Sequence, residues 1–435
     1  MHTHDRRALT RSSFIRLTCF AVLQVACAAV LFRFAARGSA AATIVYGLEC
    51  SLALYLAARL WKRDDRTAVV LIVVTAAAIR VPALLSSPAL SNDAYRYLWD
   101  GELVLRGVDP RAAAPLSPAA EPLRSTWLWT HIDYRTIPTI YPPLALALFS
   151  IAALDSQNLW GVKLVALAGD VAVVAALAAI LSAMRIPRGR VALYALHPLA
   201  ALEFAGNAHI EAWAIAGILI AAGSPRMRSF AQLRPLALAA AILTKIYPAV
   251  LAPIIFARER RALASVVALV AVAYLPSLID GHVFGSSANY LGIQRFNGSI
   301  GALFGTEGEL VVVAFVGLLA YRSVRRGAEI AAAVLATVLA YLASSPNVLP
   351  WYVLVLPAIL CVVERPFAGR MRPLSFGIIG WSCTVALAYG APSLWHETQP
   401  IGYAMRCIEY APLYAGLLVW AARLRGVEQA SRVAA

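Results

Sequence analysis

A polar and aromatic stretch interrupts a chain that is otherwise almost continuously apolar. It reads SNDAYRYLWDGELVLRGVDP and carries Asp93, Arg96, Tyr97 and Asp100. Charge close to a membrane is costly unless it faces water or a partner, so these side chains are candidates for chemistry. If the stretch is helical, Arg96, Tyr97 and Asp100 follow Asp93 at spacings of three, four and seven, and one face presents a carboxylate, a guanidinium and a phenol.

A simpler interpretation of the same residues remains open. Asn92 or Asp93 could cap a helix that begins near Ala94, and the stretch would then be a solvated loop. The two interpretations differ in where the carboxylate of Asp93 points.

The composition places these residues in a membrane protein. The chain has 435 residues, of which 61% are hydrophobic and 14% charged, and its mean hydropathy is +0.71. Such values exclude an ordinary soluble domain. The net charge of +15 does not indicate nucleic-acid binding, because the basic residues stand at the ends of apolar runs rather than in a patch.

The basic clusters predict a topology. By the positive-inside rule all of them are cytoplasmic, so the chain makes about seven excursions and crosses the membrane about fourteen times (a range of 11 to 14), with both termini in the cytoplasm. The clusters centre on Arg6, Arg7, Arg11 and Arg16; Arg59, Lys62, Arg63 and Arg66; Arg185, Arg188 and Arg190; Arg226, Arg228 and Arg234; Arg258, Arg260 and Arg261; Arg322, Arg325 and Arg326; Arg365, Arg370 and Arg372; and Arg423 and Arg425. We expect one all-α, multi-pass domain over residues 1–435 in the cell (inner) membrane.

The longest excursion, residues 85–160, is a large extracytoplasmic loop. Its last part, TIYPPLALALFSIAAL, has too few apolar residues to cross about 30 Å of hydrocarbon, so we expect an interfacial helix there. Five further outward segments should meet this loop at one external cavity: Glu203 to His209, Lys245 to Tyr247, Gly281 to Glu307, Ser344 to Tyr352, and Ala391 to Arg406.

Outward basic residues are exceptional under this topology and are candidates for holding a phosphate. Lys245 lies at an outer apex, where its ammonium could bind phosphate or extend to the interface. Arg295 could bind phosphate bidentately or be a solvated loop arginine. Lys163 is interpreted as an interfacial anchor.

His209 and Glu211 should face the cavity. They could bind a sugar, an acceptor or a divalent metal with Asp93 as a third ligand, or form a structural pair; the metal signal is weak. Glu203 lies in an apolar run and is expected to be paired. The six cysteines stand singly and predict neither a metal cluster nor a disulfide framework, so no cofactor is certain.

Four motifs in order resemble the integral-membrane glycosyltransferases of the class C fold, and most closely the polyprenyl-phosphate-mannose-dependent mannosyltransferases of glycosyltransferase family 87 and its relatives. The resemblance covers roughly residues 91–253. The motifs are NDAYRYLWDGELVLRGVDP, PTIYPPLALALF, LYALHPLAALEFAGNAHIEAW and AAAILTKIYPAVLAPIIF.

The resemblance implies roles for these residues. Asp93 would be the general base, while Arg96, Lys245 and Arg295 would bind the donor phosphate. Tyr97, Asp100, Tyr141, His209 and Glu211 would bind sugar or acceptor. Trp127, Trp129, Trp351 and Tyr352 are interpreted as aromatic residues of the membrane interface.

Three positions depart from the family pattern. Paired acids are replaced by Asn92-Asp93, Asn-Pro by His197-Pro198, and His-x-Asp by the sequence from His209 to Glu211. These replacements keep polar side chains but change their lengths, so the resemblance supports the fold better than the identity of the donor or acceptor.

The expected function is inverting transfer of a sugar, most simply mannose, from a polyprenyl-phosphate donor to an extracytoplasmic glycan or lipid acceptor. A transporter or lipid-linked sugar flippase is the alternative, and a non-catalytic assembly subunit remains open. Transporters often contain two related halves with interrupted helices in matching places. Here the large loop occurs once, which favours the enzyme.

Overall fold

The computed structural model describes residues 10–34, 40–223, 232–287, 295–390 and 400–433. Every regular element in these ranges is helical, and pairing between strands is limited to an isolated bridge at Phe296 and Asn347. The basic residues Arg6, Arg7, Arg226 and Arg228, and most of the expected outward segment from Ala391, lie outside the described residues.

The longer helices are α1 (Arg11–Phe34), α2 (Ala40–Leu60), α3 (Arg66–Leu85), α4 (Asp93–Leu105), α5 (Pro143–Ala152), α6 (Trp160–Ala183), α9 (Glu211–Gly223), α10 (Leu233–Thr244), α12 (Arg260–Asp280), α14 (Gly301–Arg325), α15 (Ile330–Ser344), α17 (Val355–Val362), α18 (Met371–Thr384) and α19 (Pro400–Val433). Shorter pieces are η1 (Pro118–Ser125), η2 (Trp127–Thr130), η3 (Arg188–Val191), α7 (Ala192–Ala195), α8 (Pro198–Ala200), η4 (Ala201–Gly206), η6 (Tyr247–Leu251), α11 (Ala252–Ile255), α16 (Pro350–Val353) and η7 (Val385–Gly390).

Six of the described helices are long and apolar enough to cross a membrane: α1, α2, α3, α6, α12 and α14. Five shorter apolar helices accompany them, so the expected count of about fourteen crossings is not confirmed. Two crossings joined at Glu203 to His209 are expected between residues 192 and 223, but the chain forms the short pieces α7, α8 and η4 and the 13-residue α9 there. Breaks of this kind are tolerated at membrane depth only where the backbone is buried in protein or lines a cavity.

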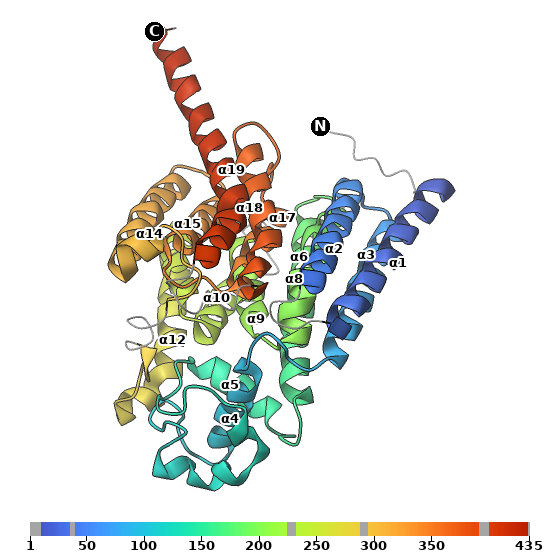
Figure 1. Ribbon diagram of the computed structural model, residues 1–435. Helices are drawn as coiled ribbons and strands as arrows, with labels where there is room; N and C mark the ends of the chain where they lie inside the picture. Colours follow the sequence, from blue (N-terminus) through green and yellow to red (C-terminus); the bar gives the residue numbers. More distant parts are fainter. Residues whose placement is uncertain (1–9, 35–39, 224–231, 288–294, 391–399, 434–435) are drawn as a thin grey trace.

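The basic segments meet at one end of the helix bundle. Arg188 donates from Nε to Asp64 at 2.7 Å, and Arg190 donates to the carbonyl of Glu364 at 3.1 Å. Comparable side-chain to backbone bonds join Arg258 to Arg325 and Arg423 to Gly369. In Figure 1, α1 begins and α19 ends at this end, at the top of the view, whereas α4 and α5 lie at the opposite end.

The polar stretch forms α4, the helix that the spacing of Asp93, Arg96, Tyr97 and Asp100 requires, and it begins at Asp93. Gly101 lets α4 approach α5, because a Cβ at this position would lie 2.1 Å from the carbonyl oxygen of Phe149. The predicted short helix after the loop is α5, with ten residues. Its inner face packs on α4, but its placement at a membrane interface is not confirmed.

Lys163 is not an interfacial anchor, contrary to the interpretation of its sequence position. Only 3% of the residue is exposed, and its ammonium donates to the carbonyls of Ala83 (3.0 Å), Leu84 (2.8 Å) and Ser86. Lys163 thus binds backbone carbonyls at the end of α3, where no further helical turn is present to pair with them. This contact fixes the start of the segment that leads to Asp93.

Candidate functional site

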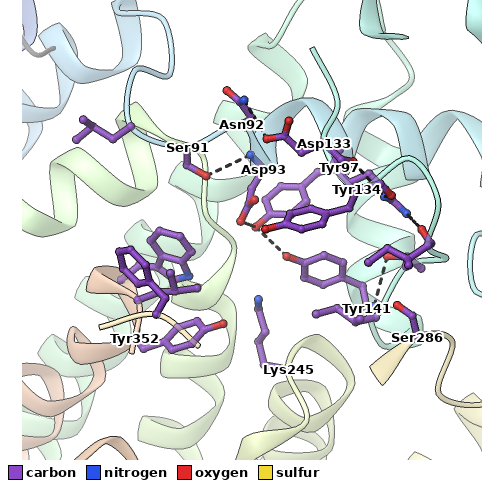
Figure 2. Close-up of a pocket in the computed structure, with 18 of the residues that line it drawn as sticks. Ser91, Asn92, Asp93, Tyr97, Asp133, Tyr134, Tyr141, Lys245, Ser286 and Tyr352 are labelled. Atoms are coloured by element: carbon purple, nitrogen blue, oxygen red, sulfur yellow. Dashed lines mark hydrogen bonds between the residues drawn. The ribbon is translucent and has the colours of Figure 1, made fainter. Parts of the chain in front are cut away.

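A cavity of about 160 Å³ lies where α4 begins. Its walls come from five stretches of sequence: residues 90–97, residues 133–141, Lys245, the connection around Ser286 and Phe296, and residues 349–352, with Tyr389 added from η7. Figure 2 shows Asp93, Tyr141 and Lys245 pointing into the same space. Of the five segments expected to meet the large loop, three contribute to this cavity: Lys245 to Tyr247, Gly281 to Glu307, and Ser344 to Tyr352. The segment from Glu203 to His209 does not line it.

Asp93 is the carboxylate at the centre of this cavity. Its side chain is 38% exposed, and its Oδ2 lies 3.4 Å from the hydroxyl of Tyr97, which donates, and 3.7 Å from Nδ1 of His209. Burial raises the pKa of Asp93 to about 6; Lys245 opposes this rise, and Glu211 adds to it. A carboxylate with this pKa is mostly ionised at neutral pH and can accept a proton.

The capping interpretation does not describe Asp93. The N-cap of α4 is Asn92, and its side chain makes no capping hydrogen bond. Asn92 instead donates from Nδ2 to Asp133 at 3.0 Å. The Asp93 carboxylate occupies the first turn of α4, where the partial positive charge of the helix start favours its ionised form.

Three aromatic rings form a wall beside Asp93. Tyr141 donates from its hydroxyl to the hydroxyl of Tyr97 at 3.0 Å, and the two rings meet edge to face with centroids 5.2 Å apart. Phe149 stacks on the buried face of Tyr97 at 4.4 Å. The phenol pair thus forms a rigid chain of hydroxyls that ends at Asp93.

His209 lies beside Asp93 but does not line the cavity. It is fully buried and stacks on Trp351 with ring centroids 3.5 Å apart. Its Nε2 lies 3.5 Å from Oε2 of Glu203. Glu203 is paired as expected, because Asn207 donates to it at 3.1 Å and Tyr389 at 2.8 Å.

The turn that carries His209 is strained. Ala208 has a φ of 63°, a left-handed conformation that is costly for alanine, and it is completely buried. Tyr134, with a φ of 53°, lines the cavity, and Asn297, with a φ of 55°, follows the lining residue Phe296. Positive φ values of this kind persist only where surrounding structure holds them, and they often mark functional sites.

Lys245 faces Asp93 from the opposite wall. It follows the end of α10, while Glu211 begins the neighbouring helix α9, and the two side chains form an ion pair of 2.5 Å. The Lys245 ammonium also lies 4.6 Å from the ring centroid of Tyr141 and 5.9 Å from that of Tyr352. An ammonium between two aromatic faces stays oriented by cation–π attraction.

Arg96 reaches the cavity, but the described contacts occupy most of its donors. Its Nε donates to Asp100 at 2.9 Å, and its two terminal nitrogens donate to the carbonyls of Tyr134 and Ile137, each at 3.0 Å. Asp100 is fully buried beneath it and does not line the cavity. Arg96 and Asp100 therefore fasten residues 133–137 to α4.

The remaining sequence candidates lie apart from this centre. Arg295 is exposed and is not part of the cavity wall, although its neighbour Phe296 is. Glu211 is 2% exposed at its side chain and touches the cavity only through Lys245. In the described part of the chain, no group of three or more histidine, cysteine, aspartate or glutamate residues is arranged to hold a metal ion.

Sequence reasoning missed several residues of the cavity. Asn92 and Asp133 are hydrogen-bonded to each other and line the cavity, and Tyr389 lines it as well. Trp351 and Tyr352 were interpreted as interface aromatics, yet both line the cavity. The signal that could have identified Trp351 and Tyr352 is their position at the end of the segment from Ser344 to Tyr352, which is expected to face the external cavity.

Comparison with known proteins gives one positive finding. The family model for the N-terminal domain of alpha-(1->6)-mannopyranosyltransferases matches residues 17–260, more than half of the 435 residues. No curated protein and no solved structure matches significantly. The matched range holds the large loop, Asp93, His209, Glu211 and Lys245. The chain therefore belongs to the alpha-(1->6)-mannopyranosyltransferase family.

Proposed function

We propose that this protein transfers mannose from a polyprenyl-phosphate donor to an extracytoplasmic glycan or lipid acceptor, with inversion at the anomeric carbon and with Asp93 as the general base. Family membership makes the chain a glycosyltransferase acting on mannose, and its apolar helices make it a membrane protein. The donor, the acceptor, the stereochemistry and the roles of single residues are our proposal.

The observation that carries the proposal is the opposition of Asp93 and Lys245 across one cavity (Figure 2). Transfer of a glycosyl group from a phosphate ester requires a base at the acceptor hydroxyl and a positive charge at the departing phosphate. Asp93 supplies the first group and Lys245 the second. The Lys245 charge is close enough to lower the pKa of Asp93.

The reaction then follows from this arrangement. The acceptor hydroxyl attacks the anomeric carbon of mannose while its proton passes to Oδ2 of Asp93. The bond from the anomeric carbon to the phosphate oxygen breaks, and the Lys245 ammonium stabilises the charge that develops on the leaving polyprenyl phosphate. Tyr141 lines the space between and is placed to bind the sugar or the acceptor, whereas the fully buried Tyr97 links the hydroxyl of Tyr141 to Asp93.

We assign His209 a positioning role, in place of direct sugar binding. It is buried, and its Nδ1 lies 3.3 Å from the Tyr97 hydroxyl, which donates to Asp93, and 3.7 Å from Oδ2 of Asp93 itself. For Arg96 the bonds to Asp100 and to the loop carbonyls favour a similar role in holding the rim that bears Asp133. Lys245 thus remains the first candidate for phosphate binding.

The direct test supplies the purified protein with polyprenyl-phosphate mannose labelled in the sugar and with membrane lipids or short mannosides as acceptors. We expect label to move to an acceptor, and we expect a nucleotide-linked mannose not to replace the donor. Transfer from the nucleotide-linked sugar alone would disprove the proposed donor while leaving the family assignment intact.

The pKa of Asp93 predicts the pH dependence of turnover. A general base works only when ionised, so below the pKa of about 6 of the unliganded protein, kcat/KM for the donor should fall about tenfold per pH unit. Above this pKa the rate should level off. The measurement is a rate profile from acidic to neutral pH. As a control, activity should recover when samples from acidic pH are returned to neutral pH, which shows that the protein did not unfold. A flat profile through pH 5 would exclude Asp93 as the base.

The proposed orientation places the cavity outside the cell and the basic end in the cytoplasm. Cysteine labelling in intact cells tests it, in a background where the exposed Cys19 and Cys407 are replaced by serine. A membrane-impermeant maleimide should label Ser125→Cys and should reach Arg326→Cys only after the membrane is opened. Both native residues are exposed, so failure to label reflects the membrane and not burial.

A further inference from the structure

A second cavity, of about 210 Å³, lies between α1 and α2 at the basic end of the bundle. Ser13 and Arg16 line it from α1, Tyr55 and Arg59 from α2, and Arg63 from the connection that follows. It shares no residue with the cavity around Asp93. Nothing in the proposed transfer reaction requires it.

The charge of this second cavity is not balanced. Arg63 pairs with Asp65 at 3.0 Å. Arg16 and Arg59 are exposed, and neither side chain has an ion pair or hydrogen bond with another described residue. Two guanidinium groups at the mouth of a hollow form a site for an anion, and their planar donors match the oxygens of a phosphate.

The surroundings of the cavity are apolar. On α1, Ile15 is 53% exposed and Val22 is 63% exposed, and on α2 Leu48 is 46% exposed. Both helices are long and apolar enough to cross a membrane, and in a membrane these exposed side chains would contact lipid tails. The Tyr55 ring packs on Phe20 with centroids 4.4 Å apart, which holds α1 against α2 and fixes one wall.

We propose that this cavity binds the phosphodiester headgroup of an anionic phospholipid from the leaflet at the basic end. Arg16 and Arg59 pair with the phosphate oxygens, the hydroxyls of Ser13 and Tyr55 donate further hydrogen bonds, and the acyl chains lie along the exposed apolar faces of α1 and α2. Basic pockets between membrane helices at a charged leaflet surface bind lipid headgroups in this way. A free phosphate compound shares the headgroup chemistry but makes no use of the adjoining apolar surface.

The test uses the full chain, reconstituted in phosphatidylcholine vesicles with or without phosphatidylglycerol and then extracted for native mass spectrometry. The parent should retain phosphatidylglycerol. Arg16→Gln combined with Arg59→Gln should bind it about thirtyfold more weakly, since each basic residue near an anionic surface contributes about fivefold. The matched control is Arg322→Gln combined with Arg326→Gln, which removes two exposed charges at the same end without touching the cavity.

Each outcome decides the proposal. Retention by the parent and the control, with loss in the cavity variant, supports it. Equal loss in both double variants indicates a general surface potential and overturns it. Thermal stabilisation of the parent by inorganic phosphate, with no retained lipid, assigns the cavity to a soluble anion and overturns it as well. If the double variant does not fold, Arg59→Gln alone should still weaken binding about fivefold.

Discussion

Asp93→Asn should lower the turnover of mannose transfer by about 10²- to 10⁴-fold, the usual effect of removing a general base. The amide keeps the shape of the carboxylate and can still accept a hydrogen bond from Tyr97, so the cavity should stay intact. Donor binding should change little, because Lys245 and the aromatic walls remain. The measurement is a comparison of kcat and KM for the donor in the variant and the parent.

Two further variants make this result specific to Asp93. Asp155→Asn removes a loop carboxylate whose contacts are with Gln157 and Asn158, outside the cavity, and should retain parental turnover. Asp133→Asn removes the other carboxylate of the cavity wall. If Asp133→Asn abolished turnover while Asp93→Asn kept it near normal, the base would be Asp133.

The position of α4 was predictable because local signals agreed. The apolar run ends near Leu85, the next residues are polar, and the spacing of Asp93, Tyr97 and Asp100 fits one helical face. The meeting of distant segments at one cavity was also predictable, since the basic clusters fix which ends of the helices share a side. Both inferences use patterns that lie along the chain itself.

The contacts around Arg96 could not be predicted in the same way. Its partners include the carbonyls of Tyr134 and Ile137, and any residue type provides a carbonyl, so no sequence pattern reveals them. The same limit applies to Lys163, whose three acceptors are backbone carbonyls at the end of α3. The sequence predicts the roles of Arg96 and Lys163 from their charge alone, whereas the positions of nearby backbone carbonyls determine their contacts.

The aromatic residues show a different limit. Trp351 and Tyr352 have the composition of an interface belt, and a belt and a cavity wall both favour a ring with a polar tip. The choice depends on which way α16 turns, and this follows from the stacking of Trp351 on His209. The predicted number of crossings is not confirmed for a related reason, because broken helices such as α8 and η4 keep the apolar composition of a span without its length.

Lys245→Met should weaken binding of polyprenyl-phosphate mannose, because it removes the charge placed against the donor phosphate and keeps most of the apolar stem. Lys245→Arg should retain part of the affinity, since it keeps the charge but changes the donor geometry. The ion pair with Glu211 complicates the Met variant, because it leaves a buried carboxylate without its partner. Lys245→Met combined with Glu211→Gln removes both charges and isolates the effect on the donor.

The acid limb of the rate profile gives an independent readout. Lys245 lowers the pKa of Asp93 and Glu211 raises it. Lys245→Met should therefore move the acid limb above pH 6, and the combined Glu211→Gln change should move it part of the way back. If Lys245→Met bound the donor as tightly as the parent, melted at a lower temperature and left the acid limb in place, Lys245 would be a structural cation, and Arg96 would be the next residue to test as the phosphate ligand.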